Sequence, residues 1–366
     1  MLATELLFVY VYCLVDDAIK AGALLIPRRP GPATSLTRMM SELIIEFTQI
    51  SRARRDRGSA DMPRAVRSAA GQPQGGIIMS SSSTLNEPAI TSYAKAPART
   101  ITAGGATYAY RELGPKGGIP VVFFVHLAGT LDNWDPRIID PIAKGHHVIA
   151  FDNRGVGAST GQVPGTVEAM ADDAYTFVRA LGFDKIDVFS FSLGGMVAQA
   201  LVVKHPELVR KLVLTGTGPR GGKGIDKVAG TTYWDMLRAA LTRSDPKEFL
   251  FFNRNATGKR AGRAFVNRLK ERTADRDANI KVKAFQTQLK AIKNWGRSVP
   301  EDLSKITQPT LIANGDHDRM VPSVLSEDLH RRIAGSDLII YPDSGHGGIF
   351  QFHEEFVSVA VEFLAR

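Results

Sequence analysis

The sequence predicts an α/β protein: a mostly parallel, doubly wound sheet with a helical segment inserted between two late strands. Three observations support this fold class. From residue 99 onward, short apolar runs alternate with amphipathic helical patterns, which is typical of a parallel sheet with helices on both faces. A serine stands in a tight turn between a buried strand and a helix. The alternation stops at residue 217 and resumes after residue 300, which indicates an insertion.

The first elements form the beginning of the sheet. Thr100–Thr102 and Ala106–Arg111 are separated by two glycines, which predicts an antiparallel hairpin. Val121–Val125 is a continuous apolar run, typical of a strand that is buried on both faces. A helix is expected near Trp134, and His147–Phe151 predicts the next strand.

The following elements lead into the serine turn. Thr166–Leu181 predicts an amphipathic helix that Thr166 caps and Gly182 ends. Ile186–Ser190 predicts a buried strand that runs into a helix over Leu193–Lys204. The remaining expected elements are the strands Lys211–Leu214, Thr310–Asn314 and Asp337–Tyr341 and the helices Ser323–Ile333 and Phe350–Leu364.

Three segments organise the chain. Residues 1–85 are expected to be an N-terminal extension that is disordered or not part of the fold. Residues 86–216 and 301–366 are expected to form one core. Residues 217–300 are expected to form a helical cap, because they interrupt the strand–helix alternation without starting a second sheet.

The N-terminal extension gives no sign of a membrane span. Its apolar run Leu6–Val15 is about half the length that crosses a bilayer, so no stable membrane insertion is expected. The arginine-rich stretch Ser51–Arg67 favours disorder. Met79 precedes four serines, which resembles an ordinary polar N-terminus. We therefore expect the natural protein to begin at Met79, with a membrane-associating or targeting segment as the alternative.

Composition excludes several classes of protein. With 44% hydrophobic and 23% charged residues, the chain has the balance of a soluble globular protein. Its one cysteine, Cys13, excludes an intramolecular disulfide and fits a reducing compartment, so a cytoplasmic location is expected. No Cys/His cluster has metal-ligand spacing, and neither a metal nor a cofactor is expected.

The positive charge is concentrated in one segment. The whole chain carries a net charge of +9, and residues 217–300 hold 19 Lys and Arg against 7 Asp and Glu. Such an excess attracts nucleic acid or anionic substrates in some proteins and is a solvated helical face in more of them. The sequence lacks the signatures of nucleic-acid-binding motifs, so a small molecule is the expected partner. The sequence makes no prediction of oligomeric state.

The serine turn has the pattern of a nucleophile elbow. In Val188-Phe189-Ser190-Phe191-Ser192-Leu193-Gly194-Gly195, small residues stand two positions before and two positions after Ser192. A strained strand-to-helix turn of this kind exposes a serine hydroxyl, and bulky neighbours would collide with it. Ser190 fails the same test, because Val188 stands at its upstream small position. Ser192 is therefore the predicted nucleophile.

A serine nucleophile needs a base and an acid that orients the base. Both are available in loops that follow predicted strands, where the active sites of parallel sheets lie. Asp316 and Asp318 follow the strand that ends at Asn314, and His346 follows the last strand. The order along the chain is serine, acid, histidine.

On these motifs, the chain from about Ala98 to Arg366 resembles proteins of the α/β-hydrolase fold. The stretch Asp152–Ser159 matches the structural D-x-R-G-x-G-x-S loop of that family. His126 matches the histidine of its H-G motif, with Leu127 in place of the glycine, and is expected to shape the loop rather than to react.

The resemblance implies a set of roles. Ser192 attacks a carbonyl carbon, His346 takes its proton and later activates water, and Asp318 orients His346. Asp316 is the competing acid; Asp318 is favoured because the family's acid usually lies three residues beyond the loop glycine. The backbone N–H groups of Ala128 and Leu193 would form the oxyanion hole.

The resemblance also implies a function. The expected reaction is cleavage of a small-molecule carboxylic ester through an acyl-enzyme, without a cofactor. The alternatives are a C–C bond hydrolase, a perhydrolase or haloperoxidase-like enzyme, and a ligand-binding receptor with low turnover. Most aromatic residues of the insertion are expected to form its core, and a few to line an apolar acyl pocket. These residues are Tyr233, Trp234, Phe249, Phe251, Phe252, Phe265, Phe285 and Trp295.

Overall fold

The computed structural model describes residues 92–366, so the expectations for the N-terminal extension, including Leu6–Val15 and Met79, lie outside the described residues. Within residues 92–366, no helix combines the length and the apolar character that crossing a bilayer requires.

The described part of the chain contains one eight-stranded sheet, in the order β1-β2-β4-β3-β5-β6-β7-β8. The pairs β1–β2 and β2–β4 are antiparallel, and every other pair is parallel, so the predicted mostly parallel sheet is confirmed. The strands are β1 Arg99–Ala103, β2 Ala106–Leu113, β3 Val121–Phe124, β4 Val148–Phe151, β5 Ile186–Phe191, β6 Val209–Thr215, β7 Thr310–Gly315 and β8 Asp337–Tyr341.

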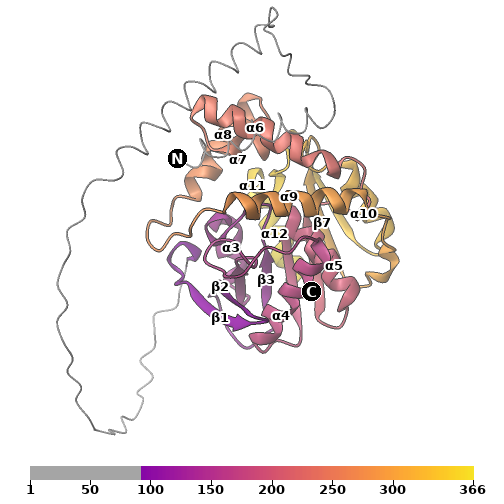
Figure 1. Ribbon diagram of the computed structural model, residues 1–366. Coiled ribbons are helices and arrows are strands. Elements are labelled where there is room, and N and C mark those ends of the chain that lie inside the picture. Colours follow the sequence, from indigo (N-terminus) through magenta and orange to yellow (C-terminus); the bar gives the residue numbers. More distant parts are fainter. Residues whose placement is uncertain (1–91) are drawn as a thin grey trace, which may run out of the picture. The chain divides into compact units, whose positions relative to one another are not determined.

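Helices cover both faces of this sheet (Figure 1). Those of the core are α3 Pro136–Ala143, α4 Val167–Ala180, α5 Leu193–Lys204, α10 Val324–Arg332, α11 Gly348–Gln351 and α12 His353–Ala365. Those between β6 and β7 are α6 Val228–Thr242, α7 Pro246–Leu250, α8 Ala256–Arg268 and α9 Val282–Arg297. Helices α4 and α5 have the bounds that the sequence predicts to within one residue, and the Thr166 side chain caps α4 by accepting from the Ala169 N–H.

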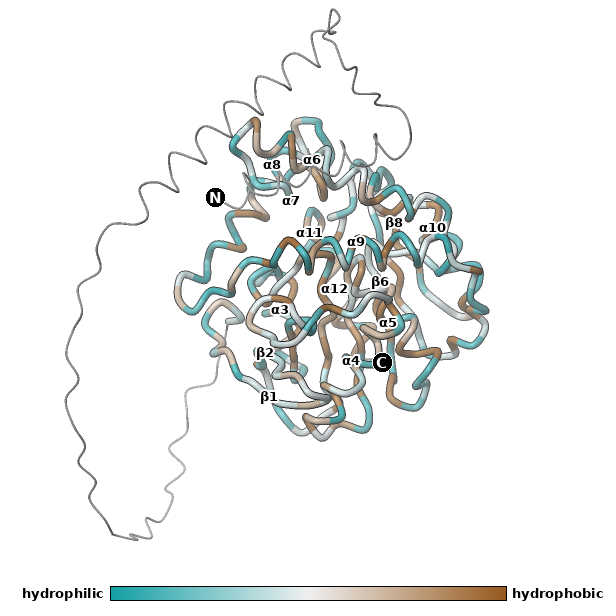
Figure 2. Tube along the Cα trace, viewed as in Figure 1, coloured by the Kyte–Doolittle hydropathy of each residue, from teal (hydrophilic) through white to brown (hydrophobic). Residues whose placement is uncertain are grey.

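Two apolar clusters lie on opposite faces of the sheet. Neighbouring residues of a strand point to opposite faces, so Val188 packs in one cluster and Phe189 in the other. The first cluster includes residues of α4, α5 and α10, and the second includes residues of α3 and α12. Figure 2 shows hydrophobic colour along the strands and hydrophilic colour on many of the outer turns. The doubly wound architecture follows from this two-sided burial.

The insertion between β6 and β7 is helical, as the sequence predicts, and shares the core of the sheet. Phe251 and Phe265 pack in the second cluster, and Phe285 and Trp295 in the first. Figure 1 shows α6, α7 and α8 beyond one end of the sheet, with α9 crossing in front of it. Trp234 lies neither in these clusters nor at the pocket wall, because 55% of it is exposed.

The final helical stretch also differs from the expectation of a single helix over Phe350–Leu364. It is divided into α11 and α12 at Phe352, whose φ of −109° and ψ of 40° are not helical. The Phe352 ring stacks on Tyr341 at the end of β8, with ring centroids 5.0 Å apart. This tertiary contact overrides the local helical pattern.

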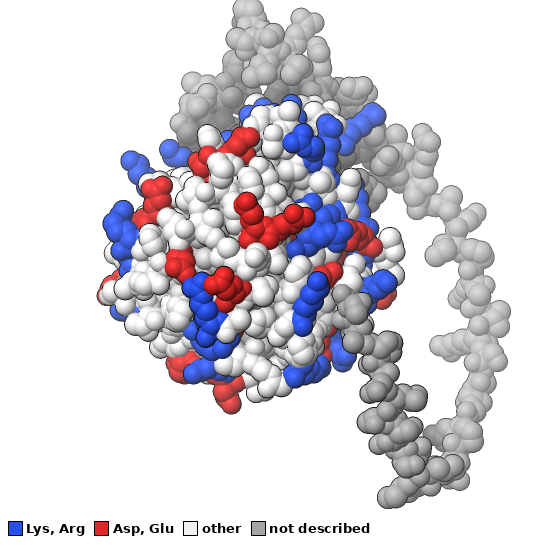
Figure 3. Space-filling view, turned by 180° about the vertical axis from the view of Figure 1, so that it is seen from behind, with Lys and Arg blue, Asp and Glu red and all other residues white. Residues whose placement is uncertain are grey.

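Basic and acidic side chains are interspersed on the face shown in Figure 3. Several basic residues of the insertion are paired: Arg268 with Asp135, and Arg254 with Asp235. On the face in view, the basic side chains therefore do not form one continuous surface.

Candidate active site

Ser192 occupies a strained turn between β5 and α5. Its φ of 58° and ψ of −118° lie outside the regions that a residue with a side chain ordinarily adopts. The Ser192 hydroxyl does not cap α5, which is the usual role of a serine before a helix. The turn instead leaves the hydroxyl free to face the loops at the carboxyl ends of the strands.

The residues around Ser192 have to be small because larger side chains would collide with neighbouring atoms. A Cβ atom on Gly194 would lie 1.9 Å from the Phe124 carbonyl oxygen, and one on Gly195 would lie 2.6 Å from Thr217. Ser190, in place of the usual glycine, is accommodated because its Oγ donates to the Val213 carbonyl across the sheet at 2.7 Å. A buried hydrogen bond thus accommodates a serine at the position where the family pattern has a glycine.

We expect Gly194→Ala to destabilise the fold and to reduce activity, because the added methyl group collides with backbone that cannot move aside. The loss should be at least 1–3 kcal/mol in the free energy of unfolding, about the usual effect of overpacking. Gly230→Ala is the matched control: Gly230 lies inside α6, and an added Cβ would meet no atom within 4 Å. Denaturant unfolding of both variants checks this, and equal stability of the two would contradict it.

Ser192, His346 and Asp318 form a buried hydrogen-bonded chain. The Ser192 Oγ lies 2.9 Å from His346 Nε2, and His346 Nδ1 lies 2.7 Å from Asp318 Oδ2. A carboxylate only accepts, so Nδ1 carries the proton and Nε2 is left to accept from the serine. The second oxygen of Asp318 accepts from the N–H groups of Met320 and Val321, which fixes the carboxylate.

Asp316, the competing acid, forms hydrogen bonds with the turn after β8. Its carboxylate accepts from the N–H groups of Asp343 and Ser344, directly after β8, and contacts His317. Asp316 therefore holds the turn that leads to His346. The structure brings Asp318, and not Asp316, to the histidine ring.

Glycines let the insertion lie directly on the His346 loop. The Gly347 N–H donates to the Phe251 carbonyl at 2.6 Å. A Cβ on Gly345 would lie 2.8 Å from that same carbonyl oxygen, and one on Gly347 would lie 3.0 Å from the Phe251 side chain. The Phe251 ring also packs edge-on against His346. The insertion thus contributes to the position of the histidine, which the sequence reasoning missed.

Ala128 and Ser192 line the same pocket, but the Ala128 N–H already donates to another side chain. This N–H donates to Oε1 of Gln288 on α9 at 2.8 Å, and Ala128 itself has a positive φ of 60°. Leu193, the other predicted oxyanion donor, begins α5 directly after Ser192. Sequence reasoning did not find Gln288, because nothing in the pattern of α9 distinguishes it from an ordinary core-facing position.

His126 is buried and uncharged. Burial lowers the pKa of its imidazole to about 3. Its Nδ1 lies 2.7 Å from the Leu127 carbonyl, which can only accept, so Nδ1 carries the proton. Phe191 and Phe251 pack edge-on against the ring. These contacts agree with the expected role of shaping the loop.

A pocket of about 410 Å³ contains the Ser192 and His346 side chains in its wall. Its apolar lining comes mostly from the insertion: Met236, Leu250, Phe251, Ile280 and Phe285, with Leu127 and Met320 from the core. Its charged lining consists of Asp132, Asp245, Lys247, Arg276 and Asp277. Three carboxylates against two cations mean that the pocket does not share the positive excess of the insertion.

A buried ionic cluster ties the core to the insertion beside this pocket. Arg111 on β2 has no exposed surface and lies 2.8 Å from Asp132 and 3.7 Å from Asp277. The Asp277 N–H also donates to Asp132. Because a buried charge is costly without its partner, this cluster fixes the loop after α8 to the sheet.

Asp152 is buried near the same cluster, and its burial together with the charge of Asp277 raises its pKa to about 8. A carboxyl whose pKa is higher in the folded state stabilises the fold below its unfolded pKa of about 4, and that stability is lost as the pH rises toward 8. We expect Asp152→Asn to remove this dependence. The Tm of the variant minus that of the unchanged protein should therefore increase between pH 5 and pH 8, and a constant difference would contradict the assignment.

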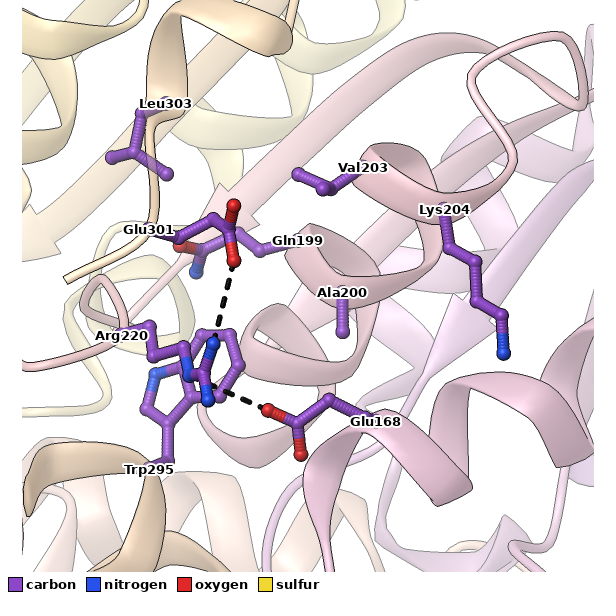
Figure 4. A pocket seen from close by; sticks show the side chains of 9 residues that line it. All are labelled: Glu168, Gln199, Ala200, Val203, Lys204, Arg220, Trp295, Glu301 and Leu303. Carbon is purple, nitrogen blue, oxygen red and sulfur yellow. Dashed lines mark hydrogen bonds and ion pairs between the residues drawn. The ribbon is translucent and has the colours of Figure 1, made fainter. Parts of the chain in front are cut away.

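A second, smaller pocket of about 140 Å³ lies apart from these residues (Figure 4). Four of its lining residues come from α5, and Trp295 and Leu303 complete its apolar part. Arg220 lies between Glu168 and Glu301, at 3.5 Å and 3.4 Å, so its charges are paired within the pocket. We assign it no ligand.

No group of three or more His, Cys, Asp or Glu side chains in residues 92–366 is arranged to hold a metal ion.

Comparison with known proteins agrees with the fold. The alpha/beta hydrolase fold family matches residues 119–352. An alpha/beta hydrolase fold protein from Chitinophaga pinensis, of solved structure, is 39% identical; the match covers 74% of this chain and 98% of that one, with a TM-score of 0.70.

Two curated relatives differ in their named activities. A 2-hydroxy-6-oxononadienedioate/2-hydroxy-6-oxononatrienedioate hydrolase of Klebsiella pneumoniae is 32% identical over 63% of this chain and 81% of its own length. A non-heme chloroperoxidase of Burkholderia pyrrocinia is 27% identical over 65% of this chain and 88% of its own length.

Proposed function

The chain belongs to the alpha/beta hydrolase fold family, and from this premise we propose that it hydrolyses a small-molecule carboxylic ester through an acyl-enzyme. The observation that carries the proposal is the hydrogen-bonded chain from Ser192 through His346 to Asp318 in the wall of the larger pocket. A histidine held in this tautomer takes the serine proton as the oxygen attacks.

In the proposed reaction, the Ser192 Oγ attacks the ester carbonyl carbon while His346 Nε2 accepts its proton. The resulting oxyanion is stabilised by the N–H groups of Leu193 and Ala128. His346 then gives the proton to the leaving alcohol, and the acyl group stays on Ser192. A water molecule, deprotonated by His346, attacks the acyl carbon, and His346 returns that proton to the Ser192 Oγ as the acid leaves. Asp318 stabilises the imidazolium at both stages.

The insertion, residues 217–300, is in this proposal a cap over the active site of a core to which the described residues 92–216 and 301–366 belong. Its apolar residues Leu250, Phe251 and Phe285 line the pocket that holds Ser192. A pocket of about 410 Å³ with this lining suits a short or medium acyl group. The single cysteine of the sequence, Cys13, supports a cytoplasmic location.

Turnover of p-nitrophenyl esters from acetyl to octanoyl tests the proposal. We expect saturable hydrolysis with a preferred chain length, because the pocket is bounded. Labelling of Ser192 by a fluorophosphonate without turnover of any ester would contradict it and would favour the low-turnover receptor.

A second candidate is hydrolysis of a C–C bond in an unsaturated oxo-dicarboxylate, the class named for the Klebsiella relative. It is favoured by Lys247 and Arg276 in the pocket lining, which could receive a carboxylate. Hydrolysis of a dienedioate of that class more efficiently than of any neutral ester would select this candidate.

A further inference from the structure

Gln288 joins the insertion to the loop that carries one of the proposed oxyanion donors. It stands on α9, has no exposed surface, and accepts from the Ala128 N–H through Oε1 at 2.8 Å. Phe285, one turn earlier on α9, lines the same pocket as Ala128 and Ser192. The contact therefore lies at the wall of the proposed active site.

The orientation of the Gln288 amide follows from its partner. A backbone N–H only donates, so the atom that faces Ala128 is the carbonyl oxygen. The Nε2 group then points away from Ala128, and it is buried without a hydrogen-bond partner among the described residues. An unpaired buried amide lowers stability, so a leucine would suit this position better if packing alone determined the residue. Gln288 thus has features that a purely structural role does not explain.

One N–H cannot serve two acceptors at full strength. We propose that Gln288 is a competing acceptor at the oxyanion site, whose Oε1 holds the Ala128 N–H until a substrate oxygen displaces it. This inference rests on the proposed function. Displacement becomes favourable as the reaction proceeds, because an oxyanion is a stronger acceptor than a neutral amide oxygen. The hydrogen bond from the Ala128 N–H to the substrate oxygen is then weak for the bound ester and strong in the transition state. Forming it requires that the hydrogen bond from Ala128 to Gln288 breaks.

Removing the competing acceptor should therefore speed the reaction. A neutral hydrogen bond of ordinary net strength corresponds to a rate change of about two- to tenfold. We expect Gln288→Leu and Gln288→Met to raise kcat/KM for p-nitrophenyl acetate by about this factor. Phosphonylation of Ser192 by a fluorophosphonate should accelerate equally, because the phosphonyl oxygen enters the same site.

The experiment compares both second-order rate constants, together with Tm, in the unchanged protein, Gln288→Leu, Gln288→Met and Lys290→Ala. Lys290 is an exposed residue on the same helix and should change nothing. Methionine keeps the length of the side chain, so it serves if leucine packs poorly. Faster reaction in the two Gln288 variants, with Tm unchanged or higher, is the expected result.

A slower or unchanged rate in both folded Gln288 variants would overturn the inference, since Gln288 would then support the loop rather than compete for it. An unchanged protein that fails to label at Ser192 would instead overturn the proposed function, and the inference with it. In a crystal structure of the phosphonylated enzyme, the Ala128 N–H should contact the phosphonyl oxygen, and a retained bond to Gln288 would contradict the exchange.

Discussion

Ser192→Ala should lower kcat for ester hydrolysis by about 10⁴-fold or more, because no acyl-enzyme can form. The geometry makes this effect specific to one of two neighbouring serines. Ser192 lies 2.9 Å from His346 Nε2, whereas the Ser190 hydroxyl donates to the Val213 carbonyl within the sheet.

Ser190→Ala is the matched control for Ser192→Ala. It removes a buried hydrogen bond and should lower stability by about 1 kcal/mol while kcat changes little. Steady-state kinetics and denaturant unfolding of both variants measure the two effects separately. A Ser190→Ala enzyme that loses turnover while Ser192→Ala retains it would reverse the assignment of the nucleophile.

Asp318→Asn should lower kcat by about 10⁴-fold with the fold intact. An amide nitrogen opposite His346 Nδ1 favours the tautomer with the proton on Nε2, where it can no longer accept from Ser192. The two N–H groups of Met320 and Val321 retain the amide oxygen as an acceptor, so the side chain should stay in place.

Asp316→Asn is the matched control for Asp318→Asn, because it makes the same chemical change two residues away. Asp316 contacts the turn at Asp343 and Ser344 rather than the histidine ring, so we expect a loss of less than about tenfold. Kinetics of the two variants against one ester decide between the acids. A larger loss in Asp316→Asn would contradict the assignment of Asp318.

Local patterns in the sequence were sufficient to predict most of the fold. The apolar run at Val121–Val125, the helix capped by Thr166 and the elbow strand all stand where the structure has β3, α4 and β5. Each depends on burial periodicity or on a cap, which are properties of neighbouring residues. The division of the last helix at Phe352 was not predicted, because it depends on stacking against Tyr341 in another element.

The residues of the candidate site also fall into those that local sequence patterns predict and those that depend on tertiary contacts. Ser192, Asp318 and His346 could be selected from the sequence because each follows a predicted strand, and the ends of parallel strands meet at one edge of a sheet. Two contacts could not be predicted from the sequence: that of Gln288 with Ala128 and that of Phe251 with the His346 loop. Each joins two segments of the chain whose relative placement is determined only when the insertion folds. The Arg111–Asp132–Asp277 cluster was missed for the same reason.

The central claim is that Ser192 is an activated nucleophile, and labelling with a fluorophosphonate followed by peptide mass spectrometry tests it most directly. The adduct should be found on Ser192, should persist in Ser190→Ala and should be absent from Ser192→Ala. An adduct on Ser190, or no adduct on a correctly folded protein, would contradict the claim.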